Sequence, residues 1–147
     1  MNILKKKINS LNHKLKAKVE EQNKNKHKEG CFVYELEADS TISSEYIFLM
    51  HFVGEIDIRL EEKIKNYLLS KQNKDGGWPL FFDGDSDISA SVKAYYALKL
   101  SGLDKNHQQM KLARDLILKK GGAEESNVFT KISLAIFGQI SWNAIPY

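Results

Sequence analysis

Apolar residues recur at steps of three and four positions along most of the chain, and this spacing predicts helices. The segments that show it are 1–22, 42–53, 58–71, 86–100, 107–120 and 126–137. No segment has a convincing strand pattern. Because the predicted loops are short, neighbouring helices should run antiparallel. We therefore expect an all-α chain of five or six helices, organised as repeated antiparallel pairs.

Residues suited to helix ends stand at the boundaries of these segments. Side chains that can cap a helix N-terminus precede four of them: Ser40 or Thr41, Asp57, Asp85 or Ser86, and Ser126 or Asn127. Glycines that can end a helix follow others: Gly54, Gly102, Gly121 and Gly138. These boundary residues support the helix prediction independently of the apolar spacing.

The stretch 72–78 joins two predicted helices and is the most distinctive part of the chain. Its paired glycines predict a tight turn, since glycine readily adopts positive φ. Trp78 then supplies a large apolar face with an indole N–H that needs an acceptor. Gln72 is expected to donate its side-chain amide to the last carbonyls of the preceding helix. The stretch thus predicts a staple between two helices.

The composition is that of a globular protein with one domain's worth of chain. Of the 147 residues, 42% are apolar and 28% are charged. No apolar run is long enough for a membrane-spanning helix, and the start lacks the features of a secretory signal. Cys31 is the single cysteine, so an internal disulfide and a cysteine-rich zinc site are both excluded. We expect a cytoplasmic location.

The charge is distributed unevenly along the chain. Residues 1–28 hold nine lysines and two glutamates, a balance of +7, so the net charge of +3 leaves −4 for the other 119 residues. The basic character therefore belongs to one appendage. We expect residues 1–29 to form a basic amphipathic helix with a polar linker, and 30–147 to form the folded domain.

The apolar stripe of the N-terminal helix admits three interpretations. Its members are Leu4, Ile8, Leu11, Leu15 and Val19. The stripe could pack against the protein's own domain, or the helix could lie on an anionic membrane surface. The lysines could also bind nucleic acid phosphates, although the aromatic residues that often accompany such lysines are missing.

The spacing of Gln72, Gly76 and Trp78 resembles the QW motif of triterpene cyclases, the family of squalene–hopene and oxidosqualene cyclases. Further stretches extend this resemblance: 87–99, 121–123, 126–130, 134–138 and 141–146. The likeness to bacterial squalene–hopene cyclases runs from about Gly30 to Tyr147. It covers only the N-terminal part of such an enzyme, and residues 1–29 depart most from it.

The resemblance implies a fold, a reaction and partners. The fold would be a partial α/α barrel (toroid), with some apolar surface left exposed or covered by a partner chain. The reaction would be proton-initiated cyclisation of squalene to hopene or hopanol, without a metal or organic cofactor. The implied partners are a downstream cyclase chain and, peripherally, the cytoplasmic face of the inner membrane; no nucleic acid is implied. Because the family's Asp-x-Asp-Asp acid is absent, the chain alone should be inactive.

Two residues match positions in the family's substrate pocket. By resemblance, Glu45 lines the lower end of the pocket, near the site where the final carbocation is quenched, and Lys93 is another pocket-side position. Considered alone, Glu45 could be an exposed carboxylate that favours the helix dipole. Lys93 could equally be an ordinary surface lysine. In the resemblance, Gln72, Gly76 and Trp78 have a structural role.

Other candidate chemistry is weak. Asp83, Asp85 and Asp87 resemble a calcium loop, but Ile88 and Ala94 occupy the positions of its essential glycine and glutamate. The family's Asp-x-Asp-Asp acid requires adjacent aspartates, and no two of these are adjacent. We therefore expect the cluster to form a helix cap and a solvated turn. The histidines have no metal-ligand spacing, and no metal site is predicted. Two other functions remain open: a non-enzymatic isoprenoid- or lipid-binding remnant, and a structural α/α subunit that completes a partner chain's barrel.

Overall fold

A computed structural model describes the backbone of residues 2–24, 30 and 39–145, and the side chains of these residues from Leu11 onward. The chain divides into two compact units, Met1–Glu37 and Ala38–Tyr147, which are described separately. The predicted boundary between residues 29 and 30 borders residues outside the described set and stays a prediction. The same holds for Cys31, which lies outside the described residues.

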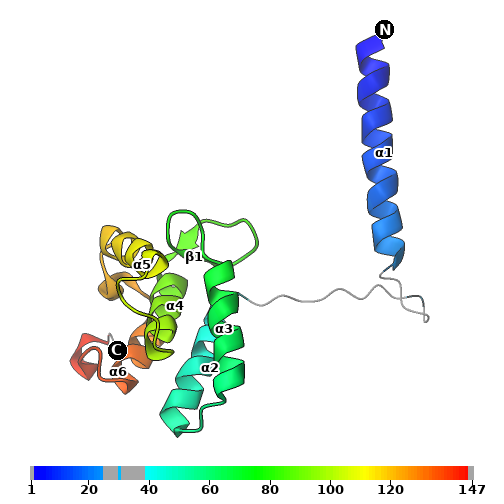
Figure 1. Ribbon diagram of the computed structural model, residues 1–147. Helices are drawn as coiled ribbons and strands as arrows, with labels where there is room; N and C mark the ends of the chain where they lie inside the picture. The colour runs from blue at the N-terminus through cyan, green and yellow to red at the C-terminus, as the bar shows by residue number, and fades with distance from the viewer. Residues whose placement is uncertain (1, 25–29, 31–38, 146–147) are drawn as a thin grey trace. The chain divides into compact units, whose positions relative to one another are not determined.

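The first unit contains one long helix, α1 (Asn2–Lys24) (Figure 1). On it, Leu11, Leu15 and Val19 are 65%, 65% and 48% exposed. The side chains of Leu4 and Ile8, the other members of the predicted stripe, lie outside the described residues.

The second unit is built from helices, which confirms the all-α prediction. Its α-helices are α2 (Ser40–Val53), α3 (Ile58–Ser70), α4 (Ile88–Leu100), α5 (Gln108–Lys119) and α6 (Val128–Ile136). Two short 3₁₀ turns, η1 (Ala123–Glu125) and η2 (Trp142–Ala144), lie before and after α6. The helix bounds differ from the predicted ones by a few residues.

A short antiparallel ladder interrupts this helical arrangement. Strand β1 (Trp78–Pro79) pairs with β2 (Ser86–Asp87), with Trp78 opposite Asp87. This ladder was not predicted, because two residues are too few to show the alternation by which a strand is recognised. The ladder closes the loop that carries the predicted turn.

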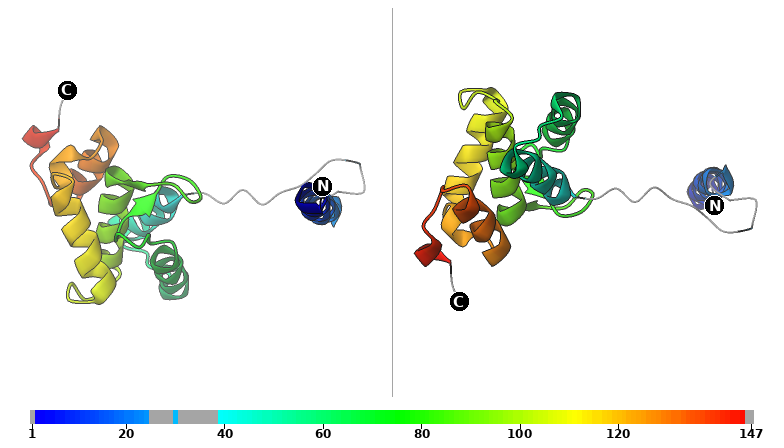
Figure 2. Two further views of the ribbon diagram at one scale, coloured as in Figure 1. Left: turned by 90° about the horizontal axis from the view of Figure 1, so that it is seen from above. Right: turned by 90° about the horizontal axis from the view of Figure 1, so that it is seen from below.

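Helix α4 lies at the centre of the second unit. It contacts α2, α3, α5, α6 and both strands, and Figures 1 and 2 show it between the α2–α3 pair and α5. Nine of its thirteen residues are buried, and they include small side chains such as Ala90, Ala94 and Ala97. Small residues let neighbouring helices approach from several directions, whereas a surface helix would bury one stripe. Lys93 is among the buried residues.

Aspartates cap the helices more often than predicted. Asp39, and not Ser40 or Thr41, caps α2 by accepting a hydrogen bond from the Thr41 N–H at 2.8 Å. Asp87 likewise caps α4 by accepting from the Ala90 N–H at 2.8 Å, in place of the predicted Asp85 or Ser86. A carboxylate is a strong N-cap acceptor, and in both cases it fixes the boundary within one or two residues of the predicted cap.

The remaining predicted boundaries agree with the structure. Asp57 caps α3, and Asn127 caps α6. Gly54 ends α2 with φ of 80°, the left-handed conformation that favours glycine.

Candidate functional site

Trp78 is the anchor of the loop between α3 and α4. Its side chain is fully buried, and its indole Nε1–H donates to the Leu68 carbonyl oxygen at 2.7 Å. Its backbone N–H donates to the Ser91 hydroxyl at 3.0 Å. Trp78 therefore satisfies a carbonyl in the last turn of α3 and attaches the loop to α4.

Gln72 has a different role from the predicted one. Its amide donates to the Gly76 carbonyl at 2.8 Å and to the Gln109 carbonyl at 2.9 Å, and not to the carbonyls of α3. A second glutamine, Gln109, donates in return to the Leu69 carbonyl at 3.0 Å. The two glutamines thus connect α3, the loop and α5. The carbonyl groups of Leu68 and Leu69 at the end of α3 accept hydrogen bonds from Trp78 and Gln109.

The two glycines of the loop are required by space as well as by conformation. Gly76 has φ of +96°, and a Cβ there would lie 2.5 Å from the backbone of Leu112 in α5. A Cβ on Gly77 would lie 2.3 Å from the Leu116 side chain and 2.4 Å from that of Ser86. The loop backbone therefore packs directly on α5, which only residues without a Cβ allow.

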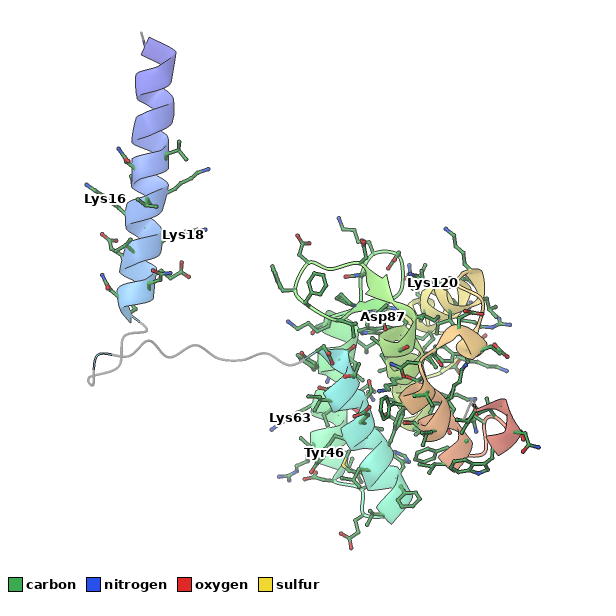
Figure 3. All side chains as sticks on the ribbon, turned by 180° about the vertical axis from the view of Figure 1, so that it is seen from behind. Lys16, Lys18, Tyr46, Lys63, Asp87 and Lys120 are labelled. Carbon is green, nitrogen blue, oxygen red and sulfur yellow. The ribbon has the colours of Figure 1, made fainter. Side chains whose placement is uncertain are left out.

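Asp75 organises the polar side of the same loop. Its carboxylate accepts hydrogen bonds from the Ser86 hydroxyl at 2.6 Å and from the Gly77 N–H at 3.1 Å. Partial burial alone would raise the pKa of Asp75, but these hydrogen bonds and the charge of Lys120 outweigh burial and lower it. Lys120 also donates to the Ser86 carbonyl at 2.8 Å, and Figure 3 shows it on the same side of the molecule as Asp87.

In the aspartate cluster at 83–87, two residues have roles in backbone structure. Asp87 is the cap of α4, and Asp83 occupies a left-handed turn position with φ of 59°. Within the described residues, no group of three or more histidine, cysteine, aspartate or glutamate side chains is placed to hold a metal ion.

Glu45 and Lys93, both selected from the sequence, form an ion pair. The Lys93 Nζ lies 2.5 Å from the Glu45 Oε1, and the pair links α4 to α2. The Lys93 side chain is only 7% exposed, whereas that of Glu45 is 48% exposed. The surface-lysine interpretation of Lys93 is therefore wrong. Its buried ammonium group is paired with a half-exposed carboxylate on α2.

Glu45 also lines an apolar groove between α2 and α6. The groove has a volume of about 220 Å³. Its walls are largely apolar and come from two helices and the residue after α6: Glu45, Phe48, Leu49, Phe52, Ser133, Ile136 and Phe137. Apart from Glu45 and Ser133, the residues that line the groove are apolar, so its surface suits contact with an apolar ligand.

Three aromatic rings support this groove. Phe48, Tyr96 and Phe137 pack against one another with centroid separations of 5.6 to 5.8 Å, in tilted or edge-to-face geometry. Phe48 and Phe137 also line the groove, while Tyr96 lies behind them and is buried. Burial raises the pKa of the Tyr96 hydroxyl. The rings therefore give one part of the groove an aromatic wall of fixed shape.

Gln109 and Ser91 were not predicted as site residues from the sequence, and Ser86 was predicted only as a possible helix cap. Each forms a hydrogen bond with a residue brought near by folding, 11 to 40 positions away. Single polar residues of common type carry no local signal of such partners. The glycine pair and the tryptophan were detectable because their conformational and packing requirements are unusual.

The second unit is therefore an all-α domain of helix pairs packed around a buried central helix, with an apolar groove beside a charged pair. The chain belongs to the family described as squalene-hopene cyclase N-terminal domain, which matches residues 15–147.

Several curated relatives are similar to the chain. It is 51% identical over 121 residues to the squalene–hopene cyclase of Zymomonas mobilis, covering 82% of this chain and 18% of that protein. It is 45% identical over 141 residues to the squalene-hopene cyclase of Schizosaccharomyces japonicus, covering 95% of this chain and 22% of that protein. A dammaradiene synthase of Dryopteris crassirhizoma is 36% identical over 118 residues, covering 80% of this chain and 17% of that protein. The chain thus spans about a fifth of the length of these relatives.

Proposed function

We propose that this chain is the N-terminal portion of an enzyme that cyclises squalene to hopene or hopanol. The observation that carries the proposal is the Glu45–Lys93 pair, which stands beside an apolar groove in a chain of this family. Two of the relatives described above are named squalene–hopene cyclases, and squalene is a hydrocarbon suited to apolar walls.

In the proposed enzyme the groove forms part of the wall of the substrate pocket. Phe48 and Phe137 present aromatic rings, which stabilise a nearby carbocation through cation–π attraction. The Glu45 carboxylate stabilises positive charge at the end of the cyclisation or orders a water molecule there. Lys93 is a positioning residue, because its ammonium group holds the Glu45 carboxylate in place.

The residues that start the reaction belong to another part of the proposed enzyme. Protonation of an alkene requires a strong acid, which the family resemblance assigns to an Asp-x-Asp-Asp motif. The 147 residues contain no such motif. We therefore propose that this chain does not cyclise squalene alone and that a downstream cyclase segment is its partner.

Exposed apolar side chains favour such a partner. Around the groove, Leu49, Phe52 and Ile136 are 54%, 68% and 47% exposed, and Phe129 on α6 is 70% exposed. An apolar surface of this kind is usually covered. This observation also favours the second candidate function, a structural α/α subunit that completes another chain's barrel.

The proposed enzyme works at the cytoplasmic face of the inner membrane, where an apolar substrate dissolves. Among the residues that the structure describes, no helix is both long enough and apolar enough to cross a membrane. We propose that contact with the bilayer is peripheral.

Complementation tests the proposal. The chain would be co-expressed with the Zymomonas mobilis relative from which the matched N-terminal segment has been removed, and products would be analysed after feeding squalene. Hopene from the pair and none from either part supports the enzyme. A stable complex without product supports the structural subunit, and saturable squalene binding by the chain alone supports a binding remnant.

A further inference from the structure

The lysines of α1 are placed along both borders of its apolar stripe. Lys7, Lys14 and Lys18 follow one another at steps of seven and four residues, so they share one side of the helix. Lys5 and Lys16 are eleven residues apart and share the other side. Figure 3 shows Lys16 and Lys18 extending to different sides of α1. An apolar stripe bordered by cations is typical of a helix that lies in a membrane interface.

The described side chains agree with this placement. Lys14, Lys16 and Lys18 are exposed, and so are Leu11 and Leu15 between them. The two acidic residues of the helix, Glu20 and Glu21, stand near its C-terminal end. The charge of +7 on residues 1–28, against −4 on the remainder, concentrates attraction for an anionic surface on this segment.

An anionic bilayer fits these features better than nucleic acid does. Lysine stems can lie along the apolar stripe while their ammonium groups reach lipid phosphates, so both parts of the helix find partners. Nucleic acid would engage the ammonium groups but leave Leu11 and Leu15 in water. Residues 1–24 also contain no phenylalanine, tyrosine or tryptophan on which a base could stack.

We propose that α1 is an interfacial helix that binds anionic phospholipid surfaces. The apolar stripe enters the boundary between headgroups and acyl chains, and the two rows of lysines bind the phosphates. This inference deepens the peripheral location proposed above. Lipid binding by α1 does not require cyclase activity, so the two proposals fail separately.

Vesicle flotation with the full chain tests the proposal. Phosphatidylcholine vesicles would be compared with equimolar phosphatidylcholine and phosphatidylglycerol, at low and high salt. We expect binding only to the anionic vesicles, weakened by salt. The triple variant Lys14→Glu, Lys16→Glu, Lys18→Glu should weaken binding on the order of a hundredfold, or about fivefold for each lysine near the surface.

A matched control distinguishes binding by the lysines of α1 from an effect of the net charge of the whole chain. Lys105→Glu, Lys111→Glu, Lys119→Glu changes exposed lysines of the second unit and alters the net charge equally, from +3 to −3. It should retain binding to anionic vesicles within about threefold, since attraction falls off within a Debye length. Circular dichroism would establish that both triple variants keep the helical content of the original.

A third variant tests the apolar stripe. Leu11→Ser with Leu15→Ser should weaken binding to the anionic vesicles at low salt, although this variant keeps every lysine. Equal binding to neutral and anionic vesicles, or equal loss in both triple variants, would overturn the proposal. Tighter binding of the chain to duplex DNA than to anionic vesicles would also overturn it, in favour of nucleic acid.

Discussion

The ammonium nitrogen of Lys93 lies 2.5 Å from the carboxylate of Glu45, a residue 48 positions earlier in the chain. Lys93 is buried in α4, and its partner Glu45 lines the apolar groove between α2 and α6. A buried ammonium group without a partner is costly, so the carboxylate is needed for stability as well as for the proposed chemistry.

The pair should respond unequally to loss of either member. Glu45→Gln leaves the Lys93 ammonium buried without a counter-charge and should lower the free energy of unfolding by about 1–3 kcal/mol. Lys93→Met replaces the cation by an apolar chain of similar length and should cost less, within about 1 kcal/mol. Urea denaturation of both variants measures the difference.

A pair with a less buried lysine provides the control for this prediction. The Glu62 Oε2 lies 2.5 Å from the Lys65 Nζ, and the two side chains are 56% and 20% exposed, against 48% and 7% for Glu45 and Lys93. Glu62→Gln should change the free energy of unfolding by less than about 0.5 kcal/mol, as expected for surface pairs. Equal effects of Glu45→Gln and Glu62→Gln would contradict the importance assigned to the Lys93 contact.

The indole N–H of Trp78 should contribute measurably to stability. Trp78→Phe keeps an aromatic ring but removes the donor to the Leu68 carbonyl and leaves a small void, at a cost of about 2–4 kcal/mol. Trp142→Phe changes a tryptophan that is 59% exposed and should cost less than about 0.5 kcal/mol. Thermal unfolding of the two variants would show the contrast, and similar melting temperatures would refute it.

Gly76 should tolerate a methyl group far less well than Gly102 does. Both have positive φ, of 96° and 77°, so alanine is strained by about 1–2 kcal/mol at either position. At Gly76 the added Cβ would also lie 2.5 Å from the Leu112 backbone, whereas nothing lies within 4 Å of a Cβ at Gly102. Gly76→Ala should therefore unfold at clearly lower urea concentration than Gly102→Ala, and equal midpoints would exclude the proposed close packing on α5.

The Asp75 network should make stability depend on pH. Because its pKa is lowered in the folded protein, Asp75 contributes stability that is fully present above the unfolded value of 3.8 and is lost as pH falls through the folded value. Asp75→Asn should reduce stability at neutral pH, with the difference shrinking below 3.8. Ser86→Ala removes the principal hydrogen bond and should raise the carboxyl pKa in an NMR titration. An unchanged pKa in Ser86→Ala would contradict the role given to that hydroxyl.

The elements of the fold could be predicted because they depend on local pattern. Apolar spacing identified each helix of the second unit, and Asp57, Asn127 and Gly54 marked boundaries correctly. The predicted cap of α2 was wrong, since Asp39 caps it and not Ser40 or Thr41. At α4 the cap is Asp87, a member of the aspartate cluster that was expected to cap a helix, and not Asp85 or Ser86. Local sequence offers several acceptors, and the backbone path selects one.

The partners of individual side chains could not be predicted from the same pattern. Gln72 was expected to bind α3, but the fold brings the Gly76 and Gln109 carbonyls within reach of its amide. Lys93 resembles a surface lysine because its burial results from packing of α4 on every side, which no local spacing shows. Family resemblance selected Glu45 and Lys93 as candidates, and the structure adds that they touch.

A chimeric enzyme tests the central claim most directly. This chain would replace the matched segment of the Zymomonas mobilis squalene–hopene cyclase, to which it is 51% identical, and the purified chimera would be incubated with squalene. A parallel chimera would carry Glu45→Gln, with thermal unfolding recorded for both.

We predict that the chimera forms hopene or hopanol, that the isolated chain forms neither, and that Glu45→Gln changes the ratio of the two products or lowers kcat in a folded chimera. A chimera that unfolds cooperatively yet leaves squalene unchanged would contradict the assignment of this chain to a squalene cyclase.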